Sequence, residues 1–197
     1  ESAIGVLRTT VAVLGGTGLE GLGLALRWAQ AGYRVVIGSR QEEKAARAVQ
    51  DARRQLEAEA KLEGATNRDA AARAEVIVLT IPFAGHEALL QEVREQARGK
   101  VVVDATVPLK GFRPPQLEAI PEGSAAQRAQ ALLPESRVVS AFHTVSAVTL
   151  AALQTPLEQD TLVCGSDGAA KEQVMALAAD IGLRPVDAGP LEASCSL

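Results

Sequence analysis

Apolar runs and amphipathic stretches alternate along the chain. Runs in which nearly every residue is apolar predict buried strands over residues 10–15, 34–38, 75–81, 100–104, 137–141, 161–164 and 184–187. Stretches with helical spacing of apolar residues predict helices over residues 18–31, 41–60, 84–97, 125–133, 146–153 and 168–182. Strands that are apolar on both faces and alternate with helices are typical of a parallel sheet covered on both sides. We therefore predict a doubly wound α/β fold with a mainly parallel sheet and helices on both faces.

The order of these elements favours one domain. Residues 108–122 are rich in proline and predict an irregular loop. The strand and helix pattern resumes after this loop and continues to residue 187, so the loop does not separate two units. We expect a single domain over residues 1–197.

Composition narrows the class of protein. The 197 residues are 47% hydrophobic and 22% charged, which is ordinary for a globular chain. The formal net charge of −4 argues against nucleic-acid binding, and no apolar run approaches the roughly 20 residues of a membrane-spanning helix. Two cysteines and two histidines give no disulfide framework and no metal-ligand spacing. We expect a cytoplasmic protein with no metal, no membrane partner and no nucleic-acid partner.

A glycine-rich motif follows the first predicted strand. Residues 16–21 fit the G-x-G-x-x-G pattern and open the first predicted helix. In this pattern Gly16 permits a tight turn, Gly18 lets the backbone approach a pyrophosphate, and Gly21 lets the helix pack closely on the strand. The helix N-terminus adds free N–H groups and partial positive charge. The alternative is a tight turn without a ligand, but the strand–turn–helix context favours a Rossmann-type dinucleotide site.

The end of the second predicted strand favours NADP over NAD. NAD sites of this kind place an acidic residue about 20 positions after the glycines, where it binds the ribose 2′-hydroxyl. Here the strand ends with Ser39 and Arg40, and Lys44 lies one helical turn further on. A hydroxyl and two cations suit a 2′-phosphate, because guanidinium offers paired donors to phosphate oxygens. In the alternative interpretation, Arg40 and Lys44 are surface charges that pair with Glu42 or Glu43.

Beyond this segment the chain resembles a known family over nearly its whole length. The shared motifs include Gly15-Gly16-Thr17-Gly18, the Gly-Ser-Arg and Glu-Glu-Lys that follow it, Leu79-Thr80-Ile81-Pro82, Val107-Pro108, residues 139–144, Val163-Cys164-Gly165 and residues 183–191. In these motifs, their order and their spacing, the chain is similar to the NADPH-dependent reductases of the deazaflavin coenzyme F-420 (8-hydroxy-5-deazaflavin:NADPH oxidoreductases).

The resemblance implies where the cofactor binds. The implied NADP(H) site comprises the phosphate loop, with its glycines Gly16 and Gly21, and the end of the second strand. Its residues are Thr17, Gly18, Leu19, Glu20, Ser39, Arg40 and Lys44. Toward the nicotinamide the resemblance implies contacts from Ile81, Val107 and Ala147. These three positions follow predicted strands, beyond whose carboxyl ends ligands of open α/β sheets bind.

Two features depart from the family pattern. Leu19 and Glu20 replace the Asn-Leu that we expect in the loop, and a carboxylate near a pyrophosphate is unfavourable. Family members also continue into C-terminal helices that help to enclose the deazaflavin, whereas this chain ends at Leu197, so we expect those helices to be absent. A homodimer would be one way to close the resulting pocket.

Candidates for acid–base chemistry are few. His143 follows a strand, and it either lines the active site or is a hydrogen-bonded structural histidine. We expect His86 to be a helix cap or a surface group, and Asp104 to bond backbone amides rather than a ribose. Hydride transfer between two cofactors does not need an acid–base constellation, because the cofactors carry the chemistry while apolar walls hold the rings together. The candidate wall residues, each also an ordinary core residue by type, are Ile81, Pro82, Val107, Phe142 and Val145.

We therefore expect an oxidoreductase that transfers a hydride between NADP(H) and coenzyme F-420. One alternative is an NADP-dependent reductase of another acceptor, such as a flavin, an imine or a ferric chelate, which the short C-terminus motivates. The other is a non-catalytic NADP-binding sensor module.

Overall fold

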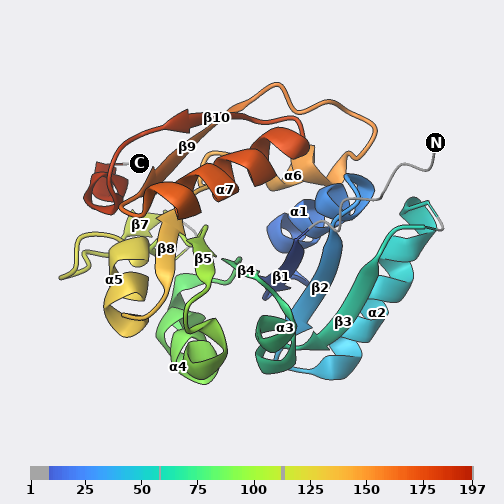
Figure 1. Cartoon of the computed structure of the whole chain (residues 1–197), viewed down its shortest axis with the longest axis horizontal. Coiled ribbons are helices and arrows are strands. Elements are labelled where there is room, and N and C mark those ends of the chain that lie inside the picture. The colour runs from blue at the N-terminus through green and yellow to red at the C-terminus, as the bar shows by residue number, and fades with distance from the viewer. Residues whose placement is uncertain (1–8, 58, 112–113, 197) are drawn as a thin grey trace.

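The computed structural model describes residues 9–57, 59–111 and 114–196, and its centre is an eight-stranded sheet (Figure 1). The strands of this sheet are β1 (Thr10–Leu14), β2 (Arg34–Ser39), β3 (Leu62–Thr66), β4 (Val76–Leu79), β5 (Val101–Asp104), β8 (Arg137–Ser140), β9 (Asp160–Gly165) and β10 (Arg184–Asp187). Their spatial order is β3-β2-β1-β4-β5-β8-β9-β10. The strands from β3 to β8 are parallel, and this order of six strands is that of a Rossmann fold. The predicted fold class is confirmed.

Helices cover both faces of the sheet (Figure 1). The α-helices are α1 (Leu19–Gln30), α2 (Glu42–Ala52), α3 (Asn67–Arg73), α4 (His86–Ala97), α5 (Ala125–Leu132), α6 (Ala147–Ala151) and α7 (Gly168–Asp180). Short 3₁₀ turns form η1 (Arg53–Gln55), η2 (Phe83–Gly85) and η3 (Leu191–Ser196). Buried residues of α1, α2 and α7 pack on one face, and those of α3, α4 and α5 pack on the other.

The two apolar layers follow from the two-residue period of the strands. In β1, Val11 and Val13 belong to the layer under α1, whereas Ala12 and Leu14 belong to the layer under α3 and α4. All four side chains are fully buried. Because both faces of such a strand are covered, its sequence is an unbroken apolar run, which is why the central strands were predictable.

Two strands at one edge run against the others. β9 pairs with β8 in antiparallel orientation, while β9 and β10 are parallel to each other. A small hairpin of β6 (Leu109–Lys110) and β7 (Gln116–Leu117) lies within the predicted loop 108–122, of which residues 112 and 113 are outside the described residues. The loop prediction missed this hairpin because each of its strands has two residues.

The largest difference from the sequence prediction follows α2. The predicted helix over residues 41–60, of which residue 58 is not described, ends at Ala52, and β3 and α3 were not predicted at all. β3 lies at the edge of the sheet and pairs with β2 alone, so it includes the exposed Glu63 and the half-buried Gly64. An edge strand lacks the continuous apolar run of a central strand. The other predicted helices and long strands agree with the structure to within two residues at each end.

Candidate functional site

A cleft of about 890 Å³ opens where β1, β2 and β4 end. Its lining residues follow these strands or belong to the helices behind them: Gly15, Thr17, Gly18, Ser39, Arg40, Gln41, Lys44, Asn67, Thr80, Ile81, Pro82, Ala84, Gly85, Ala88, Leu89 and Glu92. The structure therefore brings together six of the residues that the sequence assigned to the cofactor, namely Thr17, Gly18, Ser39, Arg40, Lys44 and Ile81.

The loop between β1 and α1 turns at Gly15. This residue has a φ of +67°, in the left-handed region that favours glycine, and a Cβ atom there would lie 2.2 Å from Cγ2 of Ile81. Gly16 lies in the same turn, as predicted, and a Cβ atom there would lie 2.7 Å from the carbonyl oxygen of Val13. Gly16 is buried, its φ is not positive, and its N–H donates to the carbonyl of Gly38 at 3.2 Å. The turn thus needs two glycines, one for its positive φ and one for its close packing.

The other two glycines of the motif lie in contrasting surroundings. A Cβ atom at Gly21 would lie 2.3 Å from Oγ1 of Thr80, so this glycine allows the close helix–strand packing that the motif predicts. At Gly18 the nearest atom would be 3.8 Å away, and the residue is exposed. The backbone at Gly18 is therefore open to a ligand.

Three helices begin at this cleft without a side-chain cap. Their N-cap residues are Gly18 for α1, Gln41 for α2 and Gly85 for α4, and none of them makes a side-chain capping hydrogen bond. The first amide groups of an uncapped helix lack an internal acceptor and carry partial positive charge. The open ends of α1 and α2 therefore form a site for an anionic ligand, whereas α4 continues from η2, whose Phe83 carbonyl accepts the His86 N–H.

Two cations and a hydroxyl stand beside the α2 end of the cleft. Ser39 is buried, and its Oγ accepts the Gln41 N–H at 3.3 Å, which leaves the hydroxyl hydrogen free to donate. Arg40 and Lys44 are exposed, and neither forms an ion pair with any residue that the structure describes. The alternative in which they pair with neighbouring glutamates is not what the structure shows.

Asn67 is a site residue that the sequence analysis missed. It is buried, lines the cleft, and accepts the Gly15 N–H at its Oδ1 atom over 3.3 Å, so it helps to fix the turn. It was missed because α3 was not predicted. A signal existed, since Thr66 caps α3 by accepting the Asp69 N–H at 3.1 Å, and this threonine-to-acid spacing marks helix starts.

The first turn of α1 carries the two unusual residues of the loop. The side chain of Leu19 is 67% exposed. Glu20 is half-buried, and this burial raises the pKa of its carboxyl from 4.5 to about 7. By helical spacing Glu20 lies on the same side of α1 as Gly23, which packs against Leu150 of α6. Neither Leu19 nor Glu20 lines the cleft with its side chain.

The three positions expected near the nicotinamide come from three neighbouring loops. Ile81 follows β4, is half-buried and lines the cleft. Val107 lies three residues after β5 and is 37% exposed. Ala147 is the first residue of α6, which follows β8, and is half-buried. Because β4, β5 and β8 are adjacent and parallel, their loops share one edge of the sheet, but Val107 and Ala147 do not line the described cleft.

Two of the expected wall residues belong to the core instead. Phe142 is fully buried, and its ring meets that of Trp28 edge to face with centroids 5.6 Å apart. Val145 is buried in the same cluster. Phe142 also has a φ of +72°, a conformation that is strained for a residue with a Cβ and is held here by its packing. The backbone therefore turns sharply before His143.

His86 and His143 both lie near Asp104, although the sequence analysis gave no reason to group the three residues. His86 is fully buried, so the prediction of a cap or surface group is wrong. Its Nε2 lies 2.6 Å from Oδ2 of Asp104, which is also fully buried. Asp104 bonds a backbone amide as expected, that of Thr106 at 2.9 Å. Burial lowers the pKa of the His143 imidazole, against the opposing effects of Asp104 and the Thr106 backbone, and its Nδ1 atom has no hydrogen-bond partner among the described residues.

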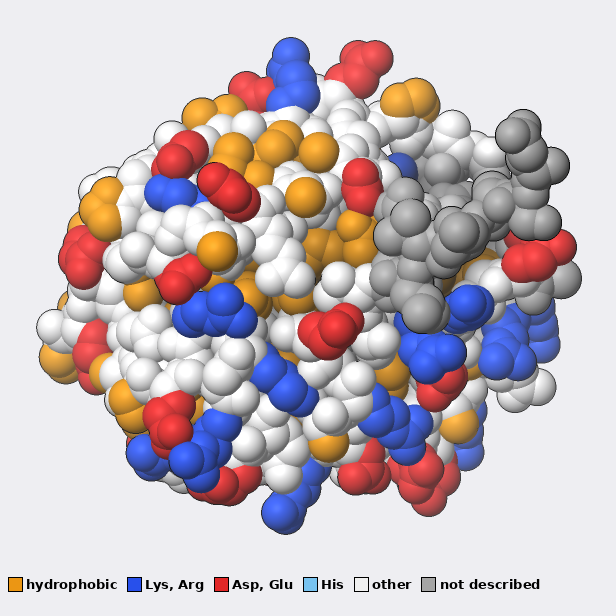
Figure 2. Space-filling model, viewed as in Figure 1, with side chains coloured by type: hydrophobic (Ala, Val, Ile, Leu, Met, Phe, Trp, Pro, Cys, Tyr) orange, Lys and Arg blue, Asp and Glu red, His pale blue; other side chains and the backbone are white. Residues whose placement is uncertain are grey.

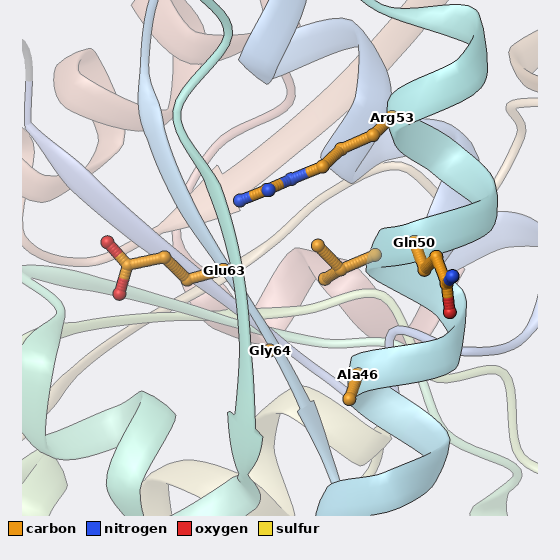
Figure 3. A pocket seen from close by; sticks show the side chains of 6 residues that line it. Ala46, Gln50, Arg53, Glu63 and Gly64 are labelled. Atoms are coloured by element: carbon orange, nitrogen blue, oxygen red, sulfur yellow. The ribbon is translucent and has the colours of Figure 1, made fainter.

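A second hollow, of about 600 Å³, lies between α2 and β3 (Figure 3). Arg53, the first residue of η1 directly after α2, reaches toward β3 and donates to the carbonyl of Leu62 at 3.1 Å. The side chains of Gln50 and Glu63 point away from each other, so no group of reactive side chains converges there. We assign no function to this hollow.

The surface seen in Figure 2 carries both signs of charge, with acidic and basic side chains interspersed. Among the described residues, no helix combines the length and the apolar character needed to cross a bilayer.

Comparison with known proteins identifies the family. A family model described as coenzyme F420-dependent NADP oxidoreductase matches residues 10–108. The F420-dependent NADP reductase of Methanocaldococcus jannaschii is 42% identical over 191 residues, which cover 93% of this chain and 85% of that protein. The chain belongs to the F420-dependent NADP oxidoreductase family. The reductase of the same name from Methanothermobacter thermautotrophicus is 44% identical over 199 residues, covering 96% of this chain and 84% of that protein.

Solved structures agree with this family membership. A protein from Arthrobacter sp. FB24, described provisionally as an F420-dependent NADP reductase, superimposes with a TM-score of 0.81 at 30% sequence identity. The superposition covers 96% of this chain and 88% of that one. The family resemblance stated from the sequence is confirmed.

Proposed function

We propose that this chain is an oxidoreductase that transfers a hydride between NADP(H) and the deazaflavin coenzyme F-420. The observation that carries the proposal is the convergence of the uncapped N-termini of α1 and α2, with Arg40 and Lys44 beside them, on one cleft. Curated relatives named F420-dependent NADP reductases support the choice of the second substrate.

The described residues fit an NADP(H) molecule. The open backbone at Gly18 and the free amides of α1 suit a pyrophosphate. Ser39, Arg40 and Lys44 suit a 2′-phosphate, because a hydroxyl and two cations supply the charge-assisted donors that it needs. Of the residues assigned from the sequence, Gly16 and Gly21 shape the loop from within it, while Leu19 and Glu20 present their backbone amides.

The main role of the chain in this reaction is to hold the nicotinamide and the deazaflavin in position. When bound, the nicotinamide supplies or accepts the hydride and the deazaflavin is its partner. Ile81 forms an apolar wall of the cleft, and Val107 and Ala147 stand on the adjoining loops. Such side chains hold a ring and exclude water without donating protons. His143, which follows β8 at the same edge of the sheet, stays a candidate catalytic residue.

An assay with both substrates tests the proposal. Purified protein with NADPH and oxidised coenzyme F-420 should bleach the visible absorbance of the deazaflavin. Turnover of free flavin, an imine or a ferric chelate without turnover of F-420 would contradict the proposal and favour another acceptor. Tight NADPH binding without turnover of any of these acceptors would favour a sensor module.

Substitution of Arg40 tests the choice of cofactor. Arg40→Ala removes the guanidinium assigned to the 2′-phosphate, and charge-assisted hydrogen bonds contribute about 1.5–3 kcal/mol each. We expect NADPH affinity to fall about 10- to 100-fold and NADH affinity to change less than about threefold, as measured by fluorescence titration.

Arg47→Ala provides a matched control, because Arg47 is exposed on the same helix and does not line the cleft. It should leave both affinities unchanged. Equal losses of NADPH and NADH affinity in Arg40→Ala would contradict the assignment.

The homodimer, the single domain and the cytoplasmic location expected from the sequence also remain proposals. Light scattering, limited proteolysis and cell fractionation would test them in turn.

A further inference from the structure

A cluster of polar residues, all buried except the half-buried His143, lies beneath the loops that follow β4, β5 and β8. These loops carry or lead to the three positions assigned to the nicotinamide end, Ile81, Val107 and Ala147. The cluster consists of His86 at the start of α4, Asp104 at the end of β5, Thr106 in the next loop and His143 after β8. None of these four residues lines the described cleft.

The Asp104 carboxylate joins two of the loops. Its Oδ2 atom bonds Nε2 of His86 at 2.6 Å, and its Oδ1 atom accepts the Thr106 N–H at 2.9 Å. His86 directly follows η2, the turn from which Ala84 and Gly85 enter the cleft. One side chain thus ties the β4–α4 loop to the β5 loop.

The third loop meets the same point. The carboxylate of Asp104 and the backbone of Thr106 both act on the pKa of the His143 imidazole, so His143 lies near them. His143 directly follows the turn at Phe142. The β8 loop therefore approaches the point at which Asp104 bonds the Thr106 amide.

Stability alone is a poor explanation of the buried pair. His86 and Asp104 are both fully buried, and apolar residues of α4, β4 and β5 form the layer around them. A buried ion pair is often no more stabilising than apolar side chains of similar volume, although losing one partner is costly. Within the described residues Nδ1 of His86 has no hydrogen-bond partner, so the polarity of this ring serves the bond to Asp104.

We propose that His86 and Asp104 are positioning residues that fix the β4–α4 loop against the β5 loop and thereby place the nicotinamide for hydride transfer. This inference rests on the proposed function. His86 and Asp104 do not touch the cofactor themselves; they act through Ile81, Gly85 and Val107. Since the adenosine end binds at Ser39, Arg40 and Lys44, the pair should affect one end of the cofactor and spare the other.

This inference is tested by comparing the affinity for the whole cofactor with the affinity for its adenosine half. NADPH and 2′,5′-ADP, which lacks the nicotinamide, are titrated against the wild type, His86→Ala, His86→Gln and Asp104→Asn. His86→Ala should bind NADPH about tenfold more weakly and bind 2′,5′-ADP within about twofold of wild type. Its kcat with coenzyme F-420 should fall about 10- to 100-fold, because displaced reacting groups lose rate steeply.

The other variants separate positioning from folding. The amide of His86→Gln can still donate to Asp104 and should restore most of both quantities. Asp104→Asn keeps an acceptor for the Thr106 amide while disturbing the bond to His86, so it should resemble His86→Ala if that variant does not fold. Arg94→Ala is the control, because Arg94 is exposed in the second half of α4 and does not line the cleft, and it should match wild type.

The same measurements give different results if this inference fails and if the proposed function fails. If His86→Ala and Asp104→Asn retain wild-type kcat and NADPH affinity, or lose 2′,5′-ADP and NADPH binding equally, the positioning role is overturned. If the wild type does not reduce F-420, the proposed function fails, and the NADPH-to-2′,5′-ADP ratio still decides whether the pair places the nicotinamide.

Discussion

The α-helices in the described part of the chain divide into two groups by how they begin. Four start with a side-chain cap that accepts a backbone N–H, and the capping residues are Thr66 in α3, Ser124 in α5, Ser146 in α6 and Asp167 in α7. Three start without one, and their N-cap residues are Gly18 in α1, Gln41 in α2 and Gly85 in α4. All three uncapped ends line the same cleft, whereas none of the four capping residues does.

The uncapped helices give up a little stability and keep their first amides open. A side-chain cap contributes about 1 kcal/mol relative to alanine but only a few tenths of a kcal/mol relative to glycine, which is the N-cap residue of α1 and α4. The amides left without a side-chain acceptor are those that a phosphate can bind. At α1 and α2 the absence of a cap is therefore a mark of the phosphate end of the site, whereas the capped helix α3 reaches the cleft through the side chain of Asn67.

Capping α1 artificially should abolish binding. Gly18→Asp places a carboxylate at the N-cap, where the backbone conformation and the open space allow a side chain. The carboxylate takes the amides assigned to the pyrophosphate and repels it, and juxtaposed like charges cost several kcal/mol. We expect NADPH affinity to fall about 100-fold or more by fluorescence titration, while the melting temperature is unchanged or slightly raised.

Gly18→Ala separates charge from bulk. It adds one methyl group, which has no atom closer than 3.8 Å, and should reduce affinity far less than the aspartate does. If Gly18→Asp binds NADPH as tightly as the wild type, the phosphates do not lie at this helix end.

Glu20 should make cofactor binding depend on pH. Because burial raises its pKa to about 7, the carboxyl is neutral below pH 7 and becomes charged as the pH rises through that value. The charged form, in the first turn of α1, opposes a bound pyrophosphate. NADPH affinity should therefore be higher at pH 6 than at pH 8, by about fivefold for a coupling near 1 kcal/mol.

Glu20→Gln isolates this contribution from the ionisation of the 2′-phosphate, which acts in both proteins. The measured quantity is the ratio of wild-type to variant dissociation constants at each pH. This ratio should be close to one at pH 6 and should increase toward pH 8. A ratio that does not change with pH would show that Glu20 does not titrate against the cofactor.

The predictability of the fold depended on how each strand is buried. β1, β4, β5 and β8 are covered on both faces, so their sequences are apolar runs that any periodicity analysis detects. β3 pairs on one side only and contains Glu63 and Gly64, so its pattern merges with that of the preceding solvated helix. The missed β3–α3 unit reflects its place at the edge of the sheet.

The site residues also differed in how well the sequence predicted them. Gly18, Ser39 and Arg40 were found because the chemistry that they serve has a local spacing in the sequence. The pairing of His86 with Asp104 joins residues 18 positions apart through the tertiary fold, and a histidine at the start of a polar helix resembles a surface group. The positive φ at Gly15 was missed because this residue precedes the G-x-G-x-x-G pattern, which begins at Gly16.

The smallest expected effect concerns a capped helix. Asp167 accepts the Ala170 N–H at 2.8 Å at the start of α7, far in sequence from the glycine motif and outside the cleft. Asp167→Ala should lower the free energy of unfolding by about 1 kcal/mol, which is about 2–4 °C in the melting temperature for a chain of this size. NADPH affinity should stay within about twofold of wild type, because this cap stabilises the fold and has no part in the site. If the affinity fell as it does in Gly18→Asp, the division between capped structural helices and uncapped binding helices would not hold.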